Sequence, residues 1–384
     1  MKVAVLGYGT VGAGVYSMLS DAPGMEAGPV LVRPGKAVES FMVSDTALIF
    51  GDPTVYAVVE TLGGLDPAYS YGMRALEAGK HFITANKAMV AAHGLELAAL
   101  AREKGAAFLF SAACGGGVPF LHNLALSAET DRIEAVSGIL NGTTNYMLDA
   151  MQRRGLSYGD ALREAQSLGY AESDPTADVS GLDTLRKMQL ACAVAFGVLP
   201  QSGMLCEGME HFTAADVEDI QSRGLVCRLL ARGSRAGESV SAYVEPVLFP
   251  RAAPESSVFT NNNMARYTGK RCGSIVLMGQ GAGRFPTASA VLRDLSAAQQ
   301  GARSMFPENC RAAEADNCEA VHSYYIRTGG FAAVRLSLRS VLAQGEVVRA
   351  VTEPMSAEKM HALAQNIRKD GNDLFFAALE EELC

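Results

Sequence analysis

The chain has 384 residues, and 33 lysines and arginines against 41 aspartates and glutamates give a formal net charge of −8. This acidic balance disfavours broad nucleic-acid binding, which requires a basic face, and no apolar run reaches the roughly 18 residues of a membrane span. Apolar residues make up 49% and charged residues 19% of the chain, which is typical of a globular protein with two or three domains. No signal peptide is expected, so we expect a cytoplasmic protein.

Predicted strands and helices alternate over the first third of the chain. Residues 2–6 (KVAVL) form an apolar, β-branched run that leads into a Gly-rich turn and then a helix to about Leu19. Further strands are predicted at 29–33, 41–43, 56–62, 81–85 and 107–112, and helices at 67–78 and 88–104. The alternation predicts a parallel sheet with helices on both faces.

The pattern changes after Gly115, Gly116 and Gly117. We predict helices at 119–129, 144–153, 158–167, 180–196 and 286–301, a strand at 132–140, and a β-rich stretch at 225–280 with a polar loop at 252–265. Residues 302–318 are polar and irregular, so we expect a linker there. The tail predicts strands at 322–327, 346–352 and 374–378 and helices at 331–343 and 356–369.

The N-terminal Gly-rich turn predicts a dinucleotide site. Gly7 allows the tight turn, Gly9 lets the backbone approach a pyrophosphate, and Gly12 allows close helix–strand packing. With Thr10 and Val11, these glycines open a helix whose N–H groups and positive dipole end favour phosphates. The alternative is a βα turn that needs glycine for packing only.

The end of the second predicted strand favours NADP over NAD. An acidic residue at this position would bind the ribose hydroxyls of NAD, whereas this strand ends in Arg33, followed closely by Lys36. Both cations are suited to the extra 2′-phosphate of NADP. Two solvated surface cations remain the alternative.

Two lysines are candidates for chemistry. Lys87 follows the strand at 81–85, at the sheet edge where open α/β sheets bind ligands. Asp183 and Lys187 are four residues apart on one helix face, and Glu172, Asp174 and Asp178 precede them. A lysine among carboxylates can donate a proton. A surface lysine at position 87 and a surface ion pair at 183 and 187 are the alternatives.

The eight cysteines form no CxxC pair. Many lie in apolar or helical stretches, which disfavours a disulfide framework or a zinc site. We expect buried free thiols in a reducing compartment.

Several blocks together resemble homoserine dehydrogenase. NGTTNY and GYAExDPxxDxxGxDxxxK are highly specific, and all blocks follow the family's order. The blocks are GYGTVGAGV at 7–15, ETLGG at 60–64, TANKA at 84–88, GGGVP at 115–119, GILNGTTNYML at 138–148, LGYAESDPTADVSGLDTLRK at 168–187, CEGMEHFTAAD at 206–216 and GAGRFPTASAVLRDL at 281–295.

The resemblance implies reversible, NAD(P)H-dependent reduction of L-aspartate 4-semialdehyde to L-homoserine, a step towards threonine, methionine and isoleucine. By motif position, Lys187 donates the proton to the carbonyl oxygen, and Lys87 lies between cofactor and substrate and assists. Asp183 holds the substrate hydroxyl region or orients Lys187, and Glu172 binds the substrate ammonium. The other predicted substrate-binding residues are Tyr170, Asn141, Gly142, Thr143 and Asp178.

The implied fold is α/β. We expect a Rossmann domain at 1–125 completed by helix 286–301, an α+β catalytic and dimerisation domain at 126–285, and an ACT-like βαββαβ domain at 320–384. A homodimer or homotetramer is expected, with a small-molecule substrate and neither nucleic acid nor membrane as partner. No fused aspartate kinase is expected, because the chain starts at the Rossmann strand.

Three regions depart from the family's pattern. Members with glutamate in place of Ser111 bind a monovalent cation, and here sodium would use the backbone carbonyls of Cys114, Gly116 and Val118, without that charge. The region 20–55 is short, which bears on the preference for NADP over NAD. In the tail, Thr328-Gly329-Gly330-Phe331 replaces the usual Asp-x-Pro-Gly turn, so a packing module is an alternative to an effector-binding ACT domain.

Two other functions compete with this one. A non-catalytic amino-acid or nucleotide sensor would not need the proton donor Lys187. A dehydrogenase with a cysteine nucleophile would need an activated thiol, and Cys114 is the only cysteine beside a Gly-rich turn in the first domain, with no neighbouring histidine in sequence.

Overall fold

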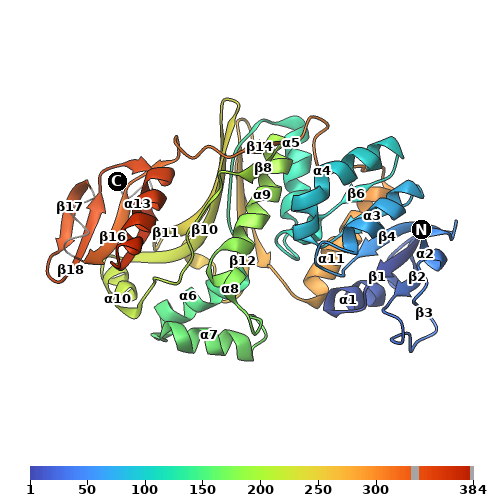
Figure 1. Cartoon of the computed structure of the whole chain (residues 1–384), viewed down its shortest axis with the longest axis horizontal. Coiled ribbons are helices and arrows are strands. Elements are labelled where there is room, and N and C mark those ends of the chain that lie inside the picture. The colour runs from blue at the N-terminus through green and yellow to red at the C-terminus, as the bar shows by residue number, and fades with distance from the viewer. Residues whose placement is uncertain (330–336, 381–384) are drawn as a thin grey trace. The chain divides into compact units, whose positions relative to one another are not determined.

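The computed structural model describes residues 1–329 and 337–380, which form two compact units (Figure 1). The first unit comprises Met1–Ile133, Gln189–Leu199 and Gly269–Ala312. The second comprises Glu134–Met188, Pro200–Thr268 and Ala313–Cys384. Over these two described stretches, no helix combines the length and the apolarity that crossing a membrane requires.

A six-stranded parallel sheet forms the centre of the first unit, in the order β3-β2-β1-β4-β5-β6. This order confirms the predicted parallel sheet, and the central strands are almost wholly buried, as helix-covered parallel strands should be. The elements are β1 (Lys2–Leu6), α1 (Thr10–Leu19), β2 (Glu26–Leu31), β3 (Met42–Val43), α2 (Ala47–Phe50), β4 (Val55–Glu60), α3 (Ala68–Glu77), β5 (His81–Thr84), α4 (Lys87–Glu103), β6 (Phe108–Leu109), η1 (Ser111–Ala113) and α5 (Phe120–Thr130).

The chain returns to this unit with β13 (Gly273–Gln280) and α11 (Arg284–Gln299). The helix predicted at 286–301 is therefore present, and it packs closely on α1. A Cβ atom at Gly14 of α1 would lie 2.9 Å from the Arg284 carbonyl oxygen and 3.3 Å from the Ala288 Cβ. Glycine at this position therefore lets the two helices approach each other.

The second unit is built on a mixed sheet whose path runs β12-β7-β10-β11-β20-β16-β18-β17. The long β10–β11 hairpin is antiparallel and has continuous register from Leu225↔Pro250 to Ala236↔Ser239. The elements before the tail are β7 (Ile133–Ile139), α6 (Gly142–Arg154), α7 (Tyr158–Ser167), α8 (Thr176–Val179), α9 (Leu182–Phe196), β8 (Val198–Ser202), β9 (Leu205–Cys206), α10 (Ala214–Ser222), β10 (Leu225–Ala236), β11 (Ser239–Pro250), η2 (Pro254–Ser257) and β12 (Asn262–Gly269).

The tail extends this sheet. Strand β20 pairs in parallel with β11, and the antiparallel strands β16, β18 and β17 follow. The helix predicted at 331–343 is wrong over 338–343, which form β17 by hydrogen bonding to β18, and its residues 331–336 lie outside the described residues. The tail elements are β14 (Arg311–Glu314), β15 (Val321–His322), β16 (Tyr324–Gly329), β17 (Leu338–Ala343), β18 (Val347–Thr352), β19 (Met355–Ser356), α13 (Ala357–Lys369) and β20 (Leu374–Leu379).

The tail and the rest of the second unit share one apolar core. Met360 and Ile367 of α13 and Phe376 of β20 belong to the same buried cluster as Val247 of β11 and Ile139 of β7. Burial of this many large side chains stabilises the junction strongly, because each contributes ~1.5–3 kcal/mol. The tail is therefore packed as part of the unit.

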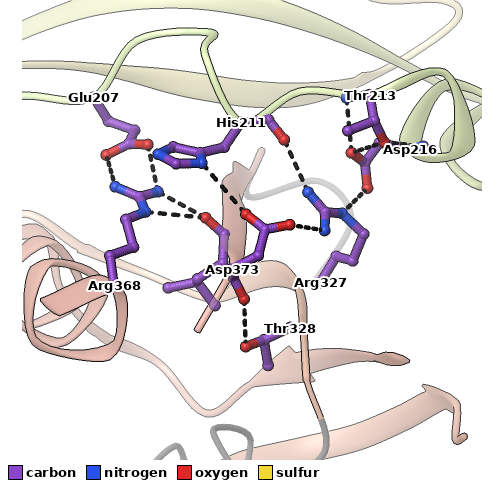
Figure 2. A network of polar contacts seen from close by, with 9 residues as sticks. Glu207, His211, Thr213, Asp216, Arg327, Thr328, Arg368 and Asp373 are labelled. Carbon is purple, nitrogen blue, oxygen red and sulfur yellow. Dashed lines mark hydrogen bonds and ion pairs between the residues drawn. The ribbon is translucent and has the colours of Figure 1, made fainter. Parts of the chain in front are cut away.

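A polar network also joins the tail to the loop that follows β9 (Figure 2). Arg327 of β16 contacts Asp216 at 2.7 Å, donates to the His211 carbonyl at 2.9 Å and pairs with Asp373. Arg368 of α13 forms a bidentate pair with Glu207, with hydrogen bonds of 2.6 and 2.9 Å. Bidentate guanidinium–carboxylate pairs restrict orientation as well as distance.

The loop held by this network in turn supports α8 and the start of α9. The Met209 N–H donates to the Val179 carbonyl at 2.8 Å, and the Cys206 thiol donates to the Ser180 carbonyl at 3.1 Å. A Cβ atom at Gly208 would lie 2.2 Å from the Val179 carbonyl oxygen, so glycine lets the loop backbone pack directly against the end of α8. The tail is thus linked by contacts to the segment that carries Asp178 and Asp183.

Candidate active site

Asn141 connects two carboxylates that lie far from it in sequence. It is the N-cap of α6, and its Oδ1 accepts a hydrogen bond from the Thr144 N–H at 2.9 Å. Its Nδ2 donates to Asp178 Oδ1 at 2.7 Å and to Asp183 Oδ2 at 2.9 Å. One capping residue therefore holds both carboxylates at the N-terminus of α6, where the helix dipole favours negative charge.

Lys187 joins this cluster from α9. Its Nζ lies 2.6 Å from Asp183 Oδ2 and donates to the Leu140 carbonyl at 2.6 Å. The side chains of Lys187 and Asp183 are only 13% and 11% exposed. The pair is therefore not the solvated surface ion pair that the spacing alone also allowed, and solvent screens it much less.

Thr143 adds a hydroxyl to the cluster. Its Oγ1 donates to the Tyr170 carbonyl at 2.5 Å and lies 3.2 Å from Asp178 Oδ2. Burial raises the pKa of Asp178 above its ordinary value, and the charge of Asp183 raises it further, while the hydrogen bond from Asn141 opposes the shift. The cluster therefore combines one lysine with two carboxylates, and the pKa of one of them, Asp178, is raised.

Glu172 lies apart from these groups. Its side chain is exposed, its backbone carbonyl accepts from Gln166 Nε2 at 3.1 Å, and its carboxylate makes no hydrogen bond to any residue that the structure describes. Gly142 begins α6, close to the Asn261 carbonyl. Among the predicted residues of this site, contacts join Asn141, Thr143, Tyr170, Asp178, Asp183 and Lys187.

The Gly-rich turn has the geometry that its sequence predicts. Gly7 has φ of +98°, which a side chain would disfavour, and a Cβ at Gly12 would lie 2.2 Å from the Gly7 carbonyl oxygen. Gly9 is the N-cap of α1, and a Cβ there would meet no atom within 4 Å. The turn therefore has no room for a side chain at Gly12, whereas the space around Gly9 is empty. Thr10 and Val11 are the first residues of α1.

The two cations predicted to select the cofactor lie beyond β2. This strand ends at Leu31, two residues earlier than predicted, because its pairing with β1 ends there. Arg33 and Lys36 are exposed, and the Lys36 N–H donates to the Arg33 carbonyl at 3.0 Å in a turn. Neither side chain forms an ion pair with any residue in 1–329 or 337–380.

A buried carboxylate organises the neighbouring sheet edge. Glu60, at the end of β4, is 0% exposed, and it accepts hydrogen bonds from Leu62 N (2.6 Å), Gly63 N (3.1 Å) and the Thr84 hydroxyl (2.5 Å). These three hydrogen bonds to one carboxylate connect the loop after β4 to the end of β5. Sequence reasoning missed this role, although Glu60 opens the ETLGG block.

Lys87 begins α4 at the same edge of the sheet. The residue before it, Asn86, caps the helix by accepting from Met89 N at 3.1 Å and donates to the Gly64 carbonyl at 2.6 Å. Lys87 is partly buried. It belongs to the first unit, whereas Lys187 belongs to the second.

Ser111 bonds to a buried acid. Its hydroxyl lies 2.5 Å from Asp294 Oδ1, and its N–H donates to Asp294 Oδ2 at 2.8 Å. Burial raises the pKa of Asp294 to about 7, although both hydrogen bonds from Ser111 lower it. Nothing in the sequence pairs these two positions, which are separated by 183 residues.

This acid makes stability depend on pH. Between pH ~4 and ~7 the folded chain keeps a proton on Asp294 that the unfolded chain has lost, so the free energy of unfolding falls as the pH rises. Relative to wild type, Asp294→Asn should gain up to ~1.4 kcal/mol of stability per pH unit across this range. Urea unfolding of both proteins at pH 5 and pH 7.5 measures the difference. The prediction would be contradicted if the difference in free energy of unfolding between the two proteins were the same at both pH values.

The cysteines are thiols without metal-site geometry. No described cysteine forms a disulfide, and Cys114 is 1% exposed. Burial raises the pKa of Cys206 to about 12, far from an activated nucleophile. Within 1–329 and 337–380, no group of three His, Cys, Asp or Glu side chains could hold a metal ion.

Two family models match the chain. "Homoserine dehydrogenase, NAD binding domain" matches residues 7–111, and "Homoserine dehydrogenase" matches residues 119–296. The first match contains the Gly-rich turn and Glu60, and the second contains the cluster around Lys187. The tail from residue 297 on lies outside both matches.

Known proteins agree with these matches. The homoserine dehydrogenase of a Synechocystis strain is 37% identical, with 77% of this chain and 72% of that protein covered. The enzyme of Corynebacterium glutamicum is 38% identical, with 76% and 70% covered. The crystal structure of a homoserine dehydrogenase from Thiobacillus denitrificans superposes with a TM-score of 0.87 at 29% identity, covering 99% of this chain and 98% of that one. A parallel dinucleotide-binding sheet, a lysine–carboxylate cluster and these similarities lead to one conclusion: the chain belongs to the homoserine dehydrogenase family of oxidoreductases that act on a CH–OH group.

Proposed function

We propose that this chain catalyses the reversible, NAD(P)H-dependent reduction of L-aspartate 4-semialdehyde to L-homoserine, with Lys187 as its proton donor. The observation that carries the proposal is the enclosed Lys187–Asp183 pair, 2.6 Å between Nζ and Oδ2, beside Asp178 and Asn141. Reduction of an aldehyde places negative charge on its oxygen. A positioned ammonium stabilises that charge and then donates a proton to the oxygen.

Asp183 and the Leu140 carbonyl orient the ammonium. Both accept from Lys187 Nζ at 2.6 Å, so the side chain keeps one direction before substrate binds. A fixed donor loses little entropy when the reaction begins. In the reverse direction Lys187 takes the proton of the homoserine hydroxyl, with Asp183 favouring the charged form that results.

The substrate is a zwitterion, so its recognition needs both charges. Asp178, held by Asn141 and Thr143, adds a second negative group beside the pair. We propose Glu172 as the ligand of the substrate ammonium, because its carboxylate is exposed and uncommitted to any residue of the described chain. Tyr170 and Gly142 complete the predicted substrate-binding set.

The first unit fits a nicotinamide dinucleotide. The open position at Gly9 leaves room for a pyrophosphate at the N-terminus of α1, and Gly7, Thr10, Val11 and Gly12 form the same turn. When bound, the nicotinamide accepts or supplies the hydride. Glu60 fixes the loops at the neighbouring strand ends, and Lys87, at the start of α4, is proposed to assist there.

NADP is the proposed preferred cofactor. Arg33 and Lys36 are exposed beyond β2, and neither has an anionic partner in the described part of the chain. A 2′-phosphate would provide one. Three aromatic side chains of the same unit, Tyr8, Tyr16 and Phe41, contact one another, and the ring centroids of Tyr16 and Phe41 lie 4.2 Å apart.

The loop around Ser111 remains the candidate place for a monovalent cation, without the glutamate that other family members have there. The loop expected to bind sodium offers the carbonyls of Cys114, Gly116 and Val118, and the Val118 carbonyl already accepts from Phe120 N at 2.8 Å. The Ser111 hydroxyl is bonded to Asp294, and the Arg293 guanidinium lies 3.4 Å from the Gly117 carbonyl oxygen. A cation here would depend on neutral carbonyl ligands, and the positive charge of Arg293 would weaken its binding.

The tail is proposed as an ACT-like module. Its strands are arranged in the order β20-β16-β18-β17, with α13 between β18 and β20 in sequence. The shared core and the Arg327 and Arg368 pairs favour a packing role for it (Figure 2). A homodimer or homotetramer is proposed for the assembled enzyme.

Oxidation of L-homoserine, followed as absorbance at 340 nm, tests the function. We expect turnover with both cofactors, faster with NADP than with NAD. Arg33→Gln with Lys36→Gln should reduce the NADP-to-NAD ratio of kcat/KM about tenfold or more, because each charge-assisted hydrogen bond contributes ~1.5–3 kcal/mol. Lys369→Gln, an exposed change in the tail, is the matched control.

Two outcomes would reject parts of the proposal. A folded protein that binds a cofactor but oxidises homoserine with neither would exclude the enzyme in favour of a sensor. An unchanged cofactor ratio in the double variant would exclude Arg33 and Lys36 as selectors of the 2′-phosphate.

A further inference from the structure

The two carboxylates beside Lys187 are carried by a short segment that has little internal support. Asp178 belongs to α8, a helix of only four residues, and Asp183 lies in the first turn of α9, with Ser180 and Gly181 between the two helices. A helix this short is marginally stable by itself. The positions of both carboxylates therefore depend on the contacts that other parts of the chain make with this segment.

The end of β9 and the loop after it provide such contacts. The Met209 N–H donates to the Val179 carbonyl at 2.8 Å, and the Cys206 thiol donates to the Ser180 carbonyl at 3.1 Å. A Cβ atom at Gly208 would lie 2.2 Å from the Val179 carbonyl oxygen and 2.6 Å from the Ser180 Cα atom. Three residues of this loop therefore contact the last residue of α8 and the residue after it.

Glu207, the remaining residue of this run, faces the tail (Figure 2). Its carboxylate accepts hydrogen bonds of 2.6 and 2.9 Å from Arg368 of α13, and the Glu207 and Arg368 side chains are 10% and 20% exposed. The same guanidinium donates to the Leu374 carbonyl of β20 at 2.8 and 3.2 Å. All three guanidinium nitrogens are therefore engaged, which fixes the direction of the Arg368 side chain.

The helix that carries Arg368 is packed in the core. Ala364 and Ile367 of α13 are 0% exposed and belong to the same buried cluster as Val247 of β11. A helix held along one face in this way is a fixed support. The pair with Glu207 connects that support to the loop that contacts α8.

We propose that Arg368 is a positioning residue for the reaction. Through Glu207 it holds residues 206–209 against α8, and so keeps the two carboxylates of the cluster beside Lys187. An enclosed carboxylate is costly without its cation. If Arg368 is removed, Glu207 turns towards water, and the backbone contacts of its neighbours with α8 loosen. This inference rests on the proposed function and adds to it a residue of the tail.

The first test is the kinetics of Arg368→Gln. A displacement of ~1 Å at the reacting groups can reduce a rate about 100-fold, so kcat for homoserine oxidation should fall about tenfold or more. The KM for NADP should stay within about twofold of wild type, because the Gly-rich turn belongs to the first unit. Lys369→Gln is the matched control, since it removes the next charge of the same helix from an exposed position.

Glu207→Gln distinguishes action through the pair from general damage to the tail. Its amide presents a donor as well as an acceptor to a guanidinium that only donates, so this variant should also lower kcat. Added to Arg368→Gln, it removes the carboxylate that has lost its partner. The double variant should therefore lose no more activity than Arg368→Gln alone, whereas two independent tenfold losses would multiply to about a hundredfold. Thermal unfolding checks that each variant is folded.

Amide hydrogen exchange tests the positioning without the reaction. In full-length Arg368→Gln, the amides of residues 176–181 and 206–209 should exchange about tenfold faster than in wild type, because they lose contacts that restrict local opening. Amides of β1, in the first unit, should exchange at the wild-type rate. Mass spectrometry of peptides from both proteins measures the rates.

Three results would overturn the inference. They are a folded Arg368→Gln whose kcat is within about twofold of wild type, single-variant losses that multiply in the double variant, and unchanged exchange at residues 206–209. If Arg368→Gln does not fold, Glu207→Gln replaces it with the same expectations. If wild-type protein oxidises homoserine with neither cofactor, the proposed function fails, and the exchange rates alone decide whether Arg368 holds the loop.

Discussion

Replacing Lys187 by alanine is expected to lower kcat for homoserine oxidation by about 10²–10⁴, the usual contribution of a positioned general acid or base. The variant loses the ammonium that Asp183 and the Leu140 carbonyl hold at 2.6 Å each. Cofactor binding should not change, since the Gly-rich turn lies in the first unit. Steady-state rates and cofactor titration by fluorescence measure the two effects separately.

Two further variants sharpen this test. Arg186→Ala changes the neighbouring exposed residue of α9 and should leave kcat within about twofold of wild type. Lys187→Arg keeps the positive charge, but a guanidinium does not release its proton in the working pH range. It should therefore bind substrate and still turn over slowly. Full activity of Lys187→Ala would remove this residue from the proposed mechanism.

The second large effect concerns two glycines of one turn, which should respond to alanine in opposite ways. A Cβ at Gly12 would lie 2.2 Å from the Gly7 carbonyl oxygen and 2.7 Å from the Thr61 hydroxyl. Because the nearest atom belongs to the backbone, Gly12→Ala should destabilise the first unit by ~1–3 kcal/mol, as overpacking typically does. Thermal unfolding measures the loss.

Gly9→Ala should keep the fold and lose the cofactor. Gly9 has φ of −77°, which alanine tolerates, and a Cβ there meets nothing within 4 Å. The new methyl group would occupy space left for the pyrophosphate, so the KM for NADP should rise about tenfold or more while thermal stability stays within ~0.5 kcal/mol. Each glycine variant is the control for the other. Equal loss of stability in both would mean that the turn needs glycine for packing only.

Local patterns predicted most elements of the first unit. The run KVAVL forms β1 at Lys2–Leu6, and the Gly-rich turn and α1 follow as predicted. Such elements are predictable because a buried parallel strand needs a continuous apolar run and the turn needs glycine. The helix α10 was missed, although Thr213 and Asp216 form a capping box that the sequence TAAD already contains.

The tail shows where local patterns were insufficient. Residues 338–343 (LRSVLA) suit a helix as well as a strand, and short apolar runs do not separate the two. Antiparallel hydrogen bonds to β18, the next strand in the chain, and the pairing of β18 with β16 decide the outcome. Tertiary context routinely overrides propensity in segments of this length.

By itself the sequence determined the dinucleotide-binding turn, the candidates Lys187 and Asp183, and the family. Those features depend on local spacing, because the turn is continuous and an i,i+4 pair shares a helix face. Only the tertiary structure decided that Asn141 joins Asp178 and Asp183, that the Leu140 carbonyl holds Lys187, and that Ser111 meets Asp294. These contacts join residues 37 to 183 positions apart. Their burial and pKa values depend on what packs around them, which no local pattern records.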